Sequence, residues 1–114
     1  MKKILDYFQQ KNIIFKSFKE IRPKELGSRK KIRIYVGVDL KGYYTNVMYL
    51  EKKSRVLRKE TEELMILHEK LEKYIDSVIK KKYMIINASL CSKAKTILEE
   101  NGWKVWHQVV DGKE

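Results

Sequence analysis

The segment from Arg33 to Lys59 constrains the fold of this chain more than any other part of the sequence. Residues 32–40 alternate apolar side chains with other residues, which is the period of a β-strand, and residues 43–52 form a second apolar strand-like segment. Because the connection between them is short, we expect these strands to pair as an antiparallel hairpin. Apolar residues then recur at helical spacing, which predicts a long amphipathic helix over residues 61–81.

The rest of the chain predicts an α/β fold of the order α-β-β-β-α-β-α-β. The further elements are a helix over residues 2–11, a strand over 13–21, a loop over 22–31, a buried strand over 83–87, a helix over 89–100 and a strand over 103–108. Right-handed crossover makes the last strand parallel to the strand before it. Residues 1–114 are therefore expected to form a single-domain sandwich of helices on a mixed sheet.

Composition limits the environment in which the protein works. The apolar runs are too short for a transmembrane helix, and the first ten residues lack the apolar centre of a signal peptide. Cys91 is the only cysteine, so no disulfide forms within the chain, which fits a reducing compartment. These features predict a cytoplasmic protein that does not bind membranes.

The positive charge is concentrated in the first half of the chain. Residues 1–59 hold 17 Lys and Arg against 5 Asp and Glu, a net of +12, whereas residues 60–114 have a net of −1. A basic surface attracts phosphate backbones, although it also serves plain solubility. We predict nucleic-acid contacts from two basic clusters, which comprise Arg29, Lys30, Lys31, Arg33, Arg55, Arg58 and Lys59.

Two carboxylates end the paired strands. Asp39 is near the end of the first, and Glu51 follows the apolar residues of the second, with Lys53 two residues later. Carboxylates on neighbouring strands can hold a divalent cation, and a lysine two residues on shares their face of the sheet. Such a metal could activate a water for cleavage of a phosphodiester.

These residues and the order of the elements resemble the PD-(D/E)xK nuclease superfamily, which has the restriction-endonuclease-like fold and includes archaeal-type Holliday junction resolvases. The resembling motifs are GVDL at 37–40 and YLEKKSR at 49–55. The resemblance implies a nuclease that binds DNA in preference to RNA, with Mg²⁺ or Mn²⁺ held by Asp39 and Glu51. Lys53 would assist catalysis, and a chain this small would have to form a homodimer to cut both strands.

Three alternatives stay open at this point. A hairpin centred on Thr45 would bring Asp39 opposite Glu51, whereas a tight turn at Lys41-Gly42 would leave the carboxylates far apart. An RNase H-like fold would instead combine Asp39 with an acid among residues 60–63 and with position 87, which is an asparagine and would make that site inactive. The third is a non-catalytic nucleic-acid-binding or regulatory module on the nuclease fold.

Overall fold

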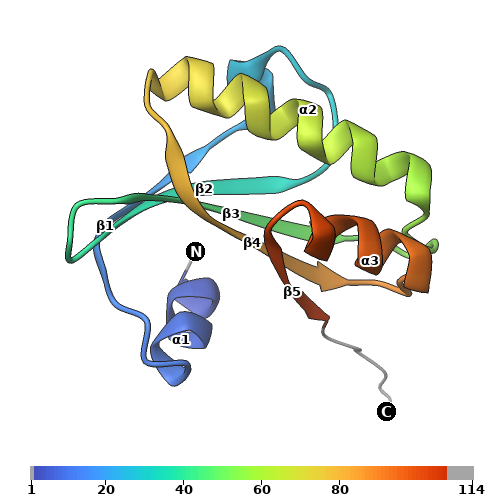
Figure 1. The fold of residues 1–114 in the computed structure, drawn as a ribbon, viewed down its shortest axis with the longest axis horizontal. Coiled ribbons are helices and arrows are strands. Elements are labelled where there is room, and N and C mark those ends of the chain that lie inside the picture. Colours follow the sequence, from blue (N-terminus) through green and yellow to red (C-terminus); the bar gives the residue numbers. More distant parts are fainter. Residues whose placement is uncertain (1, 108–114) are drawn as a thin grey trace.

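A mixed β-sheet forms the centre of the molecule, and helices cover both of its faces (Figure 1). The computed structural model describes residues 2–107. The strands lie side by side in chain order: β1 (Phe15–Ile21), β2 (Arg33–Asp39), β3 (Tyr44–Glu51), β4 (Ile79–Asn87) and β5 (Trp103–His107). The helical elements are α1 (Lys2–Gln10), the 3-10 turn η1 (Pro23–Leu26), α2 (Arg58–Ile75) and α3 (Ser92–Glu100).

The strand directions confirm a mixed α/β sandwich. β1, β2 and β3 are antiparallel neighbours, whereas β4 runs parallel to β3 and β5 runs parallel to β4. The crossover helices α2 and α3 pack on the same face of the sheet, as right-handed connections between successive parallel strands require. Both crossover helices therefore begin at the end of the sheet where strands β3 and β4 finish.

Each face of the sheet has its own hydrophobic core. Even-numbered residues of β3 such as Met48 and Leu50 face α2 and α3, where Leu64 of α2 and Leu98 of α3 are fully buried. Odd-numbered residues such as Val47 face α1. There Phe8 is completely buried, and its ring contacts the rings of Phe15, Tyr83 and Trp106. This alternation decides which polar side chains share a face at the strand ends.

The β2–β3 hairpin turns at residues 40–42, so the alternative centred on Thr45 is wrong. Val38 pairs with Tyr44, the backbone N–H of Asp39 donates to the carbonyl of Tyr43, and Gly42 adopts a left-handed φ of 89°. A three-residue connection that ends in a left-handed glycine is a common hairpin turn. The Asp39 carboxylate stabilises it, because Oδ1 accepts hydrogen bonds of 2.9 Å from the backbone N–H groups of Lys41 and Tyr43.

Helix α2 is displaced toward the N-terminus relative to the prediction. It begins at Arg58 and ends at Ile75, where Asp76 adopts a left-handed conformation with φ 53°. Strand β4 consequently begins at Ile79 and pairs along the whole of β3. Val78, which helical spacing would place in the apolar stripe of the predicted helix, is 71% exposed. Within residues 2–107, no helix is long and apolar enough to cross a bilayer.

The final helix and strand agree with the prediction apart from their limits. Helix α3 begins at Ser92, because residues 89–91 instead hydrogen-bond to the segment around Val56. Strand β5 ends at His107, and the predicted Gln108 and the tail after it lie outside the described residues.

Candidate nucleic-acid interface

The predicted pair of metal-binding carboxylates is not brought together. Asp39 lies opposite Tyr43 at the hairpin turn, whereas Glu51 lies eight residues further along β3, a separation of roughly 26 Å at about 3.3 Å per residue. Metal–oxygen bonds are only about 2.0–2.6 Å long, so no single ion joins the two carboxylates. Within residues 2–107, no group of three or more His, Cys, Asp or Glu residues is placed to hold a metal.

Asp39 has a structural environment instead. Backbone N–H donation from Tyr43, opposed by partial burial and assisted by Lys41, holds the pKa of the Asp39 carboxyl below its ordinary value. The Lys81 ammonium, 3.7 Å from Oδ2, acts in the same direction. A carboxylate that already accepts two backbone hydrogen bonds stabilises a turn, and this accounts for the aspartate at the end of β2.

Glu51 lies at the opposite end of the sheet, where β3 and β4 finish. Its Oε2 accepts a 3.1 Å hydrogen bond from the side-chain amide of Asn87, which also donates to the Tyr49 hydroxyl at 3.3 Å. Glu51 pairs with Asn87 across the parallel strands. Lys53 follows in an exposed bend. At the C-terminal end of β3, Glu51 therefore has a neutral side-chain amide as its hydrogen-bond partner.

A basic residue lies near Glu51, just before strand β2 begins. Arg33, the first residue of β2, pairs with Tyr49, and Lys31 precedes Arg33 by two residues. These residues line a shallow depression of about 240 Å³, formed by Lys31, Ile32, Arg33, Tyr49 and Glu51. A divalent cation at this position would need a second carboxylate where the chain has a lysine.

The two predicted basic clusters converge at this end of the sheet. The hairpin places the start of β2 beside the end of β3, and the link from β3 leads directly into α2. We call the exposed cations gathered here the basic rim, which comprises Arg29, Lys31, Arg33, Lys53, Arg55, Arg58 and Lys59. Two groups of cations that are at least 20 positions apart in the sequence, residues 29–33 and 53–59, thus lie at the same end of the sheet.

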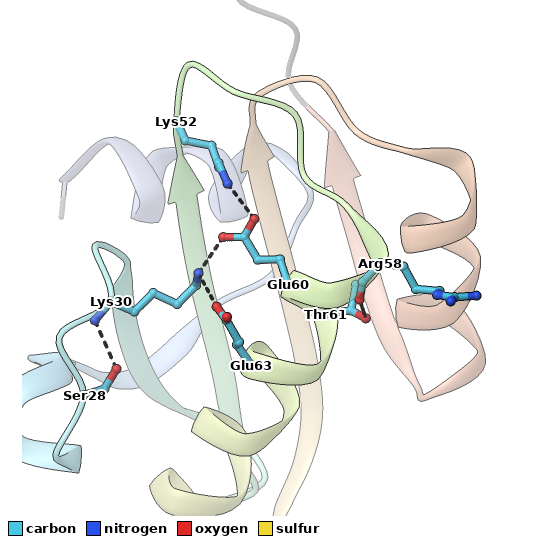
Figure 2. Close-up of polar contacts among 7 residues, drawn as sticks. All are labelled: Ser28, Lys30, Lys52, Arg58, Glu60, Thr61 and Glu63. Atoms are coloured by element: carbon cyan, nitrogen blue, oxygen red, sulfur yellow. Dashed lines mark hydrogen bonds and ion pairs between the residues drawn. The ribbon is translucent and has the colours of Figure 1, made fainter.

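Lys30, one of the residues predicted to contact nucleic acid, forms ion pairs with two glutamates (Figure 2). Its Nζ lies 2.5 Å from Glu60 and 3.0 Å from Glu63, both on the first turns of α2. Burial alone would lower the pKa of Lys30, but the two glutamates outweigh it and raise that pKa. Lys30 therefore joins the loop before β2 to helix α2, and its charge is already balanced within the protein.

Glu60 connects this lysine to a second one. Its other oxygen lies 2.7 Å from Nζ of Lys52, at the end of β3. Burial alone would raise the pKa of Glu60, but the two ammonium groups outweigh it and keep that pKa below its ordinary value. Glu60 thus lies at the same end of the molecule as Glu51 and far from Asp39, so the RNase H-like combination of Asp39 with an acid of residues 60–63 is not assembled either.

Sequence reasoning missed the roles of Lys52 and Glu60. Lys52 is the middle residue of the Glu51–Lys53 motif, and strand alternation places it on the face toward α2, opposite to Glu51. From strand alternation alone, the sequence could have predicted that Lys52 lies on the opposite face of the sheet from Glu51. The partner of Lys30 could not be found in this way, because Glu60 is 30 residues away in the chain.

Comparison with known proteins gives a fold but no family. No protein-family model and no curated protein matches the sequence. Among solved structures, a repair endonuclease from Pyrococcus abyssi matches with a TM-score of 0.51 and 19% identity, over 89% of this chain and 42% of that one. The EndoMS-dsDNA2 complex matches with a TM-score of 0.51 and 20% identity, over 95% of this chain and 42% of that one. The chain thus spans less than half the length of these nucleases, with which it shares a fold.

Proposed function

We propose that this protein binds DNA through the basic rim, on a restriction-endonuclease-like fold, without a metal site formed by Asp39 and Glu51. The observation that carries the proposal is the convergence of the two basic clusters at one end of the sheet. One of the structural neighbours is described as a complex with dsDNA, so duplex DNA is the first nucleic acid to test.

Electrostatics supports this assignment. The rim cations come from the loop before β2 and its first residue, and from the link between β3 and α2 and the first two residues of α2. The β2–β3 hairpin brings these segments to the same end of the sheet. Exposed like charges at the same end of the sheet repel one another, and bound phosphates would relieve that repulsion while releasing counterions from DNA. Such binding weakens steeply as salt is added.

The arrangement at Glu51 favours binding over catalysis. A Mg²⁺ or Mn²⁺ site built on Asp39 and Glu51 does not fit the distance between them. Lys31 lines the same depression as Glu51 and supplies positive charge where a nuclease of this chemistry would need a further acid. We therefore rank a non-catalytic DNA-binding domain first.

Metal-dependent cleavage of DNA is the second candidate. It is favoured by Glu51, which lines the depression at the rim, and by endonucleases as structural neighbours. In this case Glu51 and Lys53 would act with ligands other than Asp39.

Binding and cleavage can be measured on the same labelled duplex. We expect fluorescence anisotropy to show salt-dependent binding in EDTA, and we expect the DNA to remain intact after incubation with Mg²⁺ or Mn²⁺. Glu51→Gln should bind at least as tightly as the wild type, because it removes a negative charge from a phosphate-binding edge. Metal-dependent cutting that is lost in Glu51→Gln would favour the second candidate, and the absence of binding at low salt would contradict both.

A further inference from the structure

Glu60 joins three segments of the chain at the basic rim (Figure 2). One carboxylate oxygen contacts Lys30, from the loop that precedes β2, and the other contacts Lys52, immediately after β3. Glu60 itself belongs to the first turn of α2. Its side chain is only 11% exposed, and those of Lys30 and Lys52 are 17% and 29% exposed. These contacts are therefore shielded from solvent far more than a typical surface ion pair.

The contacts of Glu60 also constrain the residues that follow Lys30 and Lys52 in the chain. Lys31 follows Lys30 and Lys53 follows Lys52, and in each pair the first lysine is partly buried whereas the second is exposed. Glu60 thus holds inward the two lysines that directly precede Lys31 and Lys53 of the basic rim.

We propose that Glu60 is a positioning residue for DNA binding. Through Lys30 and Lys52 it fixes the loop before β2 and the link after β3, which carry rim cations, relative to each other. This inference rests on the proposed function. In this role Lys30 and Lys52 contact Glu60 and not DNA, and the phosphates are bound by the residues beside them.

Charge and geometry make opposite predictions for this residue. Glu60 is an acid beside a surface that binds phosphates, so simple electrostatics predicts that its removal tightens DNA binding and frees two lysines for further contacts. A positioning role predicts weaker binding, because Lys52 would lose its ion pair with Glu60 and Lys30 would keep only its contact with the more exposed Glu63. The two segments that carry the rim cations would then no longer be joined through one carboxylate.

Glu60→Asp separates geometry from charge. Aspartate keeps the negative charge but is one methylene shorter, so it cannot reach both ammonium groups from the same backbone position. We expect Glu60→Asp and Glu60→Gln each to weaken binding of a labelled duplex by roughly fivefold, the lower end of typical coupling between two positions. The matched controls are Glu62→Asp and Glu62→Gln, on an exposed residue of the same helical turn. We expect no change from the first and slightly tighter binding from the second.

Stability is measured in parallel by thermal unfolding, and binding is compared well below each melting temperature. A purely structural role would lower the melting temperature of the Glu60 variants while the folded protein bound DNA as the wild type does, and that result would overturn the inference. Tighter binding by Glu60→Gln, matching Glu62→Gln, would also overturn it. Failure of the wild type itself to bind DNA would instead overturn the proposed function.

Discussion

Asp39 and Tyr43 face each other across the turn of the β2–β3 hairpin, and the Asp39 carboxylate accepts a hydrogen bond from the backbone N–H of Tyr43. This relationship places Asp39 at the end of the sheet remote from Glu51. The aspartate that most resembled a metal ligand in the sequence is thereby a turn residue, and the hairpin register decides between the two roles.

We predict that Asp39→Ala lowers stability and leaves DNA binding unchanged. The substitution removes an acceptor from the N–H groups of Lys41 and Tyr43, so the melting temperature should fall by a few degrees. Because the folded-state pKa of Asp39 is depressed, its contribution is present at neutral pH and is lost as the pH falls through that pKa. Thermal unfolding at neutral and acidic pH checks this. A large loss of DNA affinity in the folded variant would show that Asp39 has a functional role.

Gly37 provides space for an aromatic ring. A Cβ atom at this position would lie 2.6 Å and 2.8 Å from two ring carbons of Phe15. We therefore expect Gly37→Ala to reduce the free energy of unfolding by about 1–3 kcal/mol, the usual cost of overpacking. Chemical denaturation measures this cost. In the double variant with Phe15→Leu, the smaller side chain leaves room for the new methyl group, so Gly37→Ala should reduce the free energy of unfolding much less. If the effects of the two substitutions on the free energy of unfolding simply add, the contact between residues 37 and 15 is contradicted.

Protonation of His68 should destabilise the fold. The side-chain amide of Asn46 donates to Nδ1 of His68 at 2.8 Å, which requires a neutral ring. Burial lowers the pKa of His68, assisted by Lys82, and the nearby Glu72 and Glu69 only partly offset this. The ring of Trp103 packs against it at a centroid distance of 5.4 Å.

The sign of this pH dependence follows from linkage. Below the unfolded pKa of about 6.5 the unfolded chain binds a proton that the folded chain resists, so stability is complete above that pH and falls below it. The slope for one proton cannot exceed about 1.4 kcal/mol per pH unit. We expect His68→Gln to flatten the stability profile between about pH 5 and 7. Parallel profiles for variant and wild type would contradict this assignment.

Cys91 should react faster than an ordinary thiol. Backbone N–H groups of Ala94 and Lys93, at the start of α3, lower the pKa of Cys91 in spite of partial burial, and Arg55 contributes in the same direction. A larger thiolate fraction at neutral pH accelerates alkylation. The rate of modification by iodoacetamide, followed against pH, should have a midpoint below that of the same protein unfolded in urea. Equal midpoints would show that the helix start does not activate the thiol.

Much of the fold could be predicted because the local patterns agree with the tertiary structure. The alternation in β2 and β3, the apolar stripe of α2 and the parallel last strands are all found. The end of α2 could not be predicted, because Val78 continues the helical stripe while β4 begins at Ile79 to pair with the whole of β3. There the energy of strand pairing outweighs a local pattern.

The candidate site was predicted in part. The two basic segments around Lys31 and Arg55 were identified from the sequence, and the β2–β3 hairpin brings them to the same end of the sheet. The metal site depended on the hairpin register, and a short shift of the turn separates Asp39 from Glu51. Individual partners such as Glu60 for Lys30 depend on packing between distant segments, which no local pattern encodes.

The central claim, that the basic rim is the DNA-binding surface, is tested most directly by removing equal charge from the two ends of the sheet. Lys31→Gln with Arg33→Gln changes the rim, and Lys41→Gln with Lys80→Gln changes exposed lysines at the hairpin-turn end. The measurement is the slope of the logarithm of DNA affinity against the logarithm of salt concentration. We predict that the rim pair weakens binding and reduces that slope by about 2, while the other pair changes it little. Equal effects of the two pairs would contradict the claim.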